Sequence, residues 1–181
     1  MVEMSVHRIG LDQSGQALVI LSDLSGQRLL PILIGPFEAN AIAMELRGEK
    51  FERPLTHDLF THTLEALGFR VSTIEIVKLD GGIFYATLHV SDGVREVEID
   101  SRPSDALALA LRANARIFVA EEVLQEAQVL VSDLDDSEED EMARFRELMA
   151  RVNLGTAQVE PPVEPDEPDV ENEDDRTEDG G

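Results

Sequence analysis

Alternation of apolar and polar positions divides the N-terminal part of the chain into short elements. A period of two predicts three strands, over residues 4–11, 17–24 and 28–34. Apolar residues at helical spacing then predict two helices, over residues 37–47 and 57–67, each followed by a glycine. The first half of the chain is therefore expected to contain three strands followed by two helices.

The same alternation returns in the next sixty or so positions. Pro103 sets the backbone angle φ for the first turn of an Ala- and Leu-rich helix, so a strand-to-helix corner is expected there. The predicted elements are strands over 69–79, 83–91 and 94–100, a helix over 103–112, a short extended piece over 117–119 and a helix over 120–128.

The two halves align at an offset of 67 residues, which places Pro36 on Pro103 and Glu38 on Asp105. We therefore expect an α+β fold built from two copies of a three-strand, two-helix unit, over about residues 1–67 and 68–131. The strands are expected to share one strongly curved, barrel-like mixed sheet, with the helices packed outside it.

The composition changes after residue 131. Residues 1–131 carry 11 Lys/Arg and 19 Asp/Glu, a net charge of −8, whereas residues 132–181 carry 4 and 19, a net charge of −15. An acidic linker with an amphipathic helix is predicted over 132–155, the helix itself over 138–152. Residues 156–181 are rich in proline and acidic residues and poor in apolar ones, so a disordered tail is expected.

Composition also excludes several classes of function. The chain has no cysteine, which excludes disulfides, thiolate metal sites and a cysteine nucleophile. No apolar run approaches the roughly 20 residues that a membrane helix needs, and no signal-peptide pattern opens the sequence, so we expect a cytoplasmic protein without a membrane role. The net acidity argues against tight non-specific binding of nucleic acid.

The corner before the third predicted helix concentrates charged groups. Asp105 lies in the first turn, where a carboxylate stabilises free backbone N–H groups, and this structural role is sufficient to explain it. Asp100 and Arg102 interrupt the apolar pattern where the aligned residues of the first half are Leu33 and Gly35. They indicate either an ion pair that braces the corner or a functional site.

A second polar cluster opens the helix predicted from residue 57, with Thr56 as its expected N-cap. Asp58 and His62 lie four residues apart and hence on one helical face, which suits two metal ligands or a simple charge pair. His57 is a candidate general base, because imidazole exchanges protons near neutral pH.

Four segments together identify a known family. Residues 30–39, 53–59, 99–106 and 119–124 resemble the motifs of the bifunctional nuclease domain family, in the same order along the chain. The resemblance covers about residues 3–130 and implies a duplicated fold around a barrel-like sheet, a homodimer, and DNase and RNase activity. By this resemblance, His57, Asp58, Asp100, Arg102 and Asp105 match the polar positions of the family's motifs.

The leading hypothesis is therefore a nuclease that hydrolyses RNA or DNA with the help of a metal ion. Asp58, Asp100 and Asp105 would hold Mg²⁺ or Mn²⁺, His57 would activate water, and Arg102 would stabilise charge on the phosphate. No organic cofactor is expected. The alternatives are a dimeric, non-catalytic binding or regulatory module, and a domain whose own site is blocked by its acidic tail.

Overall fold

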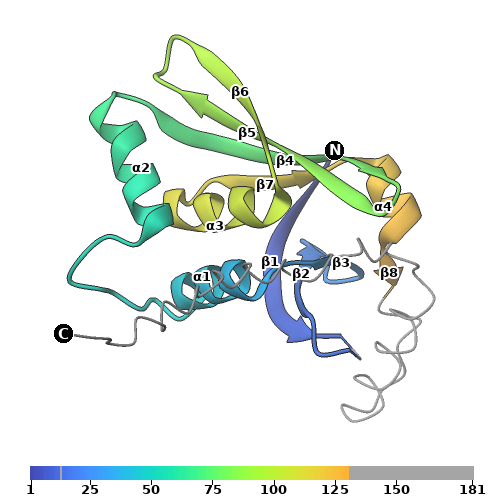
Figure 1. Cartoon of the computed structure of the whole chain (residues 1–181). Helices are drawn as coiled ribbons and strands as arrows, with labels where there is room; N and C mark the ends of the chain where they lie inside the picture. The colour runs from blue at the N-terminus through green and yellow to red at the C-terminus, as the bar shows by residue number, and fades with distance from the viewer. Residues whose placement is uncertain (13, 131–181) are drawn as a thin grey trace, which may run out of the picture.

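A computed structural model describes residues 1–12 and 14–130 (Figure 1). The predicted acidic helix and tail, over 132–181, lie outside the described residues. The elements in chain order are β1 (Val2–Leu11), β2 (Ala17–Asp23), β3 (Arg28–Leu33), α1 (Pro36–Leu46), α2 (Thr56–Ala66), β4 (Arg70–Asp80), β5 (Ile83–Ser91), β6 (Glu96–Ser101), α3 (Pro103–Ala113), β7 (Arg116–Val119), α4 (Glu121–Ala127) and β8 (Val129–Leu130).

The strands form one mixed sheet in the order β6-β5-β4-β7-β1-β2-β3-β8. Neighbouring strands are antiparallel except for β4 and β7, which run parallel. The α+β class and the mixed sheet are thereby confirmed, but the expected barrel-like closure is wrong, because the sheet is open between β6 and β8. Since β8 has only 2 residues, it is too short to pair along β6 and close the sheet.

The helix α3 lies at the centre of the molecule. In Figure 1 it runs between the β4–β6 strands on one side and α1 on the other. Its small residues Ala106, Ala108 and Ala110 are fully buried and allow close approach from several sides. The helix packs against α1, α2, β4 and β5, so it is covered by other helices on one side and by strands on the other.

The duplication stays a prediction. Each half of the described chain begins with three antiparallel strands that lead into a helix with proline at its first position. The halves differ afterwards, because β7 separates α3 from α4 and no strand separates α1 from α2. This strand pairs with both β1 and β4 and so joins the two sets of strands into one sheet.

The helix α3 begins at the expected residue, and the other three helix starts differ from the expected ones by a single residue. The helix α2 begins at Thr56, and its N-cap is Leu55 instead of the expected Thr56. The Leu55 backbone N–H donates to the Asp58 carboxylate over 2.8 Å, so an acidic side chain inside the first turn stabilises this start. No helix among residues 1–12 and 14–130 is both long and apolar enough to cross a bilayer.

Candidate functional site

A cleft of about 670 Å³ lies where α1, the start of α2 and the start of α3 meet. The polar side chains that line it include Glu38 and Asn40 from α1, His57 from α2, and Arg102 and Asp105 from the corner before α3. Three of the five residues expected at a site, His57, Arg102 and Asp105, are therefore brought together by the fold.

These side chains form a continuous chain of charged contacts. The Nε2 atom of His57 lies 3.5 Å from Oδ1 of Asp105. The other carboxylate oxygen of Asp105 accepts a hydrogen bond of 2.7 Å from Nε of Arg102. Arg102 continues the chain by donating from Nη2 to Glu38 over 2.8 Å. Helices from both halves of the chain are thus connected through one guanidinium group.

Burial differs along this chain of contacts. The side chains of His57 and Glu38 are both 18% exposed, whereas that of Arg102 is 66% exposed. The adjacent carboxylate of Asp105, and then that of Glu38, raise the pKa of the Arg102 guanidinium, so its charge persists. The cleft therefore offers solvent a permanent cation beside a partly buried imidazole and carboxylate.

The contact between His57 and Asp105 is long for a hydrogen bond. Such contacts between catalytic groups commonly shorten only when substrate is bound. A carboxylate next to one ring nitrogen can orient the imidazole and stabilise its protonated form. The pair can therefore act in general acid–base chemistry if the other ring nitrogen, Nδ1, reaches a substrate.

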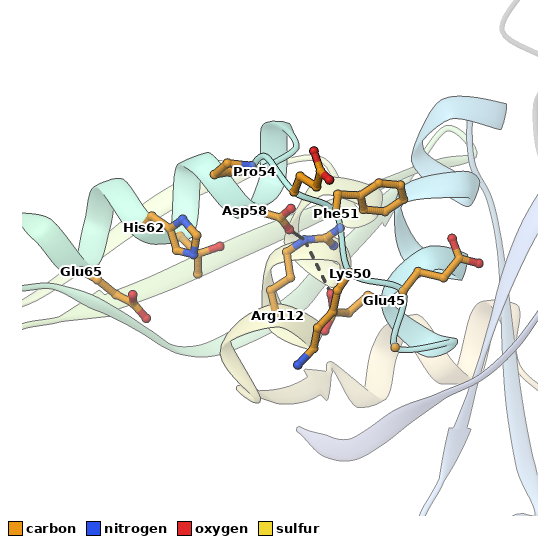
Figure 2. Close-up of a pocket in the computed structure, with 12 residues that line it drawn as sticks. Glu45, Lys50, Phe51, Pro54, Asp58, His62, Glu65 and Arg112 are labelled. Atoms are coloured by element: carbon orange, nitrogen blue, oxygen red, sulfur yellow. Dashed lines mark hydrogen bonds and ion pairs between the residues drawn. The ribbon is translucent and has the colours of Figure 1, made fainter.

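Asp58 lies in a second pocket, of about 510 Å³, which Figure 2 shows. Its Oδ1 atom accepts a 2.5 Å hydrogen bond from Nε of Arg112, whose side chain is only 6% exposed. Arg112 also donates to the backbone carbonyl groups of Ala108, over 2.9 Å, and Ala41, over 3.3 Å. One buried guanidinium thus joins α1, α2 and α3.

The environment of Asp58 favours its ionised form. Partial burial opposes ionisation, but the hydrogen bonds from Arg112 and from the Leu55 N–H outweigh it and lower the Asp58 pKa below 3.8. In this structure, both carboxylate oxygens already accept these bonds. Asp58 is therefore placed to stabilise the start of α2, and with it the position of the neighbouring His57.

Asp100 lies apart from the other expected site residues. It pairs with Thr87 across β5 and β6, whereas its neighbour Ile99 pairs with the buried Leu88. Because alternate strand residues point to opposite faces, Asp100 points away from the face that α3 covers. It lines neither of the pockets that contain His57 and Asp58.

The expected metal ligands do not form one group. Asp58 is bonded to Arg112, Asp105 contacts both His57 and Arg102, and Asp100 points to the other face of the sheet. Over residues 1–12 and 14–130 no three His, Asp or Glu side chains are arranged to hold a metal ion. The described residues therefore do not fit a Mg²⁺ or Mn²⁺ site built on these three carboxylates.

Sequence reasoning missed two residues of this region. Glu38 was noted only for its alignment with Asp105, but it also pairs with Arg102 across 64 positions. Arg112 received no role, although a charged residue after the apolar run 106–111 is a signal for a buried ion pair. Its partner was not visible in the sequence, because 54 positions separate it from Asp58.

Comparison with known proteins identifies the family. The family model described as the bifunctional nuclease domain matches residues 19–132, which is more than half of the chain. The chain belongs to the bifunctional nuclease domain family. The matched range contains all five expected site residues.

Relatives of this family member have been found in bacteria and plants. An uncharacterized protein of Mycobacterium tuberculosis, recorded in strains CDC 1551 and H37Rv, is 41% identical over 160 residues, which cover 84% of this chain and 96% of the relative. The rice protein named Bifunctional nuclease 2, from Oryza sativa subsp. japonica, is 26% identical over 106 residues. That match covers 57% of this chain and 33% of the rice protein.

Proposed function

We propose that the protein is a nuclease that hydrolyses phosphodiester bonds of RNA or DNA at the cleft between α1, α2 and α3. The contact between His57 and Asp105 carries this proposal, because it joins an imidazole and a carboxylate 48 positions apart at a solvent-accessible cleft. Membership of the bifunctional nuclease domain family, and the name of the rice relative, support the same activity.

Four of the expected site residues have separate roles in this reaction. His57 removes a proton from the water molecule that attacks phosphorus, while Asp105 orients the ring and stabilises the imidazolium that forms. The bond between phosphorus and the leaving sugar oxygen breaks as the new bond forms, and that oxygen takes a proton from solvent. The guanidinium of Arg102 donates hydrogen bonds to the phosphate oxygens as negative charge develops on them. Asp58 acts through the position of His57, since it anchors the first turn of α2.

A requirement for Mg²⁺ or Mn²⁺ stays a prediction. Asp100, predicted as a ligand of that metal ion, lies outside this cleft and has no part in the reaction proposed here. We further propose that the protein works as a cytoplasmic homodimer. Nucleic acid is the expected partner, and its binding is expected to be weak because the domain is acidic.

A cleavage assay tests the proposal with single- and double-stranded RNA and DNA. His57→Gln and Asp105→Asn are expected to lower the rate by about 100-fold or more, which is typical for loss of a general base or its support. His62→Gln is the matched control, because His62 lies on the same helix but lines the other pocket. Equal cleavage by wild type and His57→Gln protein would reject the proposal, and an EDTA arm tests the metal prediction.

The second candidate is a non-catalytic, dimeric binding or regulatory module. It is favoured by the two carboxylates that already neutralise Arg102, which suits a brace between α1 and α3. Under this alternative, highly purified wild-type protein cleaves no faster than the Asp105→Asn variant. The same substitution then lowers the melting temperature, and unchanged melting would argue against the brace.

A further inference from the structure

The most exposed aromatic residue of the described chain lies at the proposed active site. Phe37 is 86% exposed and lines the same cleft as His57 and Arg102. Burial of a phenylalanine side chain is worth about 1.5–3 kcal/mol to a folded protein, so this ring contributes almost none of that stabilisation. A single exposed ring needs no explanation by itself, but the position of Phe37 in the cleft of His57 and Arg102 makes the ring available to a bound substrate.

The position of Phe37 on α1 makes it part of a continuous surface. Phe37, Asn40, Ala41 and Met44 all line the cleft and follow the spacing of one helical face. They present an aromatic ring, an amide, a small side chain and a thioether in that order. This surface offers a ring on which a planar ligand can stack and an amide able to hydrogen-bond the polar edge of that ligand.

We infer that Phe37 stacks against one unpaired base of the substrate, and that the enzyme therefore acts on single-stranded nucleic acid. The inference rests on the proposed function and deepens it by naming the class of substrate. Arg102, 66% exposed at the same cleft, contacts the phosphate next to the stacked base, while the amide of Asn40 meets the base edge.

Charge supports the choice of a stacking contact. The domain is acidic, with a net charge of −8 over residues 1–131, and the cleft itself contains Glu38 and Asp105 beside Arg102. Phosphate contacts alone therefore supply little affinity. Stacking on an aromatic ring is independent of net charge and available only to bases that are not already stacked in a duplex.

Binding without turnover tests the inference. A fluorescein-labelled DNA single strand of about ten nucleotides is titrated with His57→Gln protein, with and without Phe37→Ala, and anisotropy is measured. Loss of the ring is expected to weaken binding about 5- to 150-fold, the range for one stacked base. Phe37→Trp is expected to retain binding. Phe60→Ala is the matched control, since Phe60 is 43% exposed on α2 and does not line the cleft.

Two further ligands distinguish stacking from other roles of the ring. For a strand of the same length that lacks bases, and for a duplex, Phe37→Ala is expected to change affinity by less than about twofold. An equal loss for the strand without bases would overturn the inference, as would unchanged binding of the normal strand. It would also be overturned if sedimentation showed that Phe37→Ala converts a dimer to monomers, because the ring would then belong to a subunit interface.

The two proposals fail in different ways. Anisotropy in the His57→Gln background reports only binding, whereas the cleavage assay compares His57→Gln with wild type. Loss of base-dependent binding in Phe37→Ala protein supports the inference whatever the cleavage result. Because Phe37 is exposed, Phe37→Ala should change the free energy of unfolding by less than about 0.5 kcal/mol. A loss of binding in this variant would therefore not be due to misfolding.

Discussion

Removal of the Arg112 side chain is the sharpest test of how the cleft is held together. Arg112→Ala deletes a guanidinium that is 6% exposed and bonded to Asp58 and to two backbone carbonyl groups, one on α1 and one on α3. It leaves the Asp58 carboxylate without its cation at the start of α2. The three helices that form the cleft then lose their shared polar contact.

The expected loss of unfolding free energy in Arg112→Ala protein follows from these contacts. Removing one partner of a buried ion pair costs about 3–5 kcal/mol, because the other charge is left uncompensated. The Asp58 side chain is 26% exposed, so water replaces part of what is lost, and we expect about 3 kcal/mol. For a domain of this size that corresponds to a fall in melting temperature of about 10 °C.

Urea unfolding followed by far-ultraviolet circular dichroism measures this loss, with an unchanged m-value as the condition for comparing variants. Arg95→Ala is the control, because the Arg95 side chain is 70% exposed and its pair with Asp92 should contribute less than about 1 kcal/mol. A double-mutant cycle with Asp58→Ala should give a coupling above about 1 kcal/mol. A loss below about 1 kcal/mol in Arg112→Ala protein, or no coupling, would refute the reasoning.

Two further predictions concern single groups. Because the folded-state pKa of Asp58 lies below its unfolded value of 3.8, its stabilisation is present above that pH and is lost as pH falls through the folded pKa. The difference in unfolding free energy between wild type and Asp58→Asn should therefore narrow below about pH 4 in acid titrations, and a constant difference down to about pH 2 would contradict this. Asn114 ends α3 in the left-handed region, at φ 52°. A β-branched residue is strained at this φ, so Asn114→Val should lower the free energy of unfolding by about 1–2 kcal/mol, whereas Asn114→Gly should change it by less than about 0.5 kcal/mol. Equal melting temperatures of the two variants would contradict this expectation.

The sequence was a good guide to where elements begin and end. Pro103 begins α3 as predicted, because its ring fixes φ at a value suited to the first helical turn. The start of α2 differs from the prediction by one residue, since the Asp58 side chain, and not a Thr56 cap, satisfies a free N–H group. Such local signals depend on a few neighbouring residues and are visible without a fold.

The sequence was a poorer guide to packing. The short extended piece predicted over 117–119 becomes β7, which lies between β4 and β1 and joins the two sets of strands. A strand of four residues carries too little information to specify pairing with two strands that are distant in the chain. The burial of α3 on several sides was likewise not specified by the sequence, because a helix rich in alanine suits both an exposed surface and a crowded interior.

For the candidate site, the sequence by itself supplied the polar residues that interrupt its apolar patterns, His57, Asp58, Asp100, Arg102 and Asp105. Only the tertiary structure showed which of these residues lie together and which lie apart. Helix packing brings His57 to Asp105, a buried Arg112 binds Asp58, and the pairing register of β5 and β6 turns Asp100 to the other face. The physical reason is that residue type and spacing act over a few positions, whereas the partner of a charged group depends on how distant elements pack.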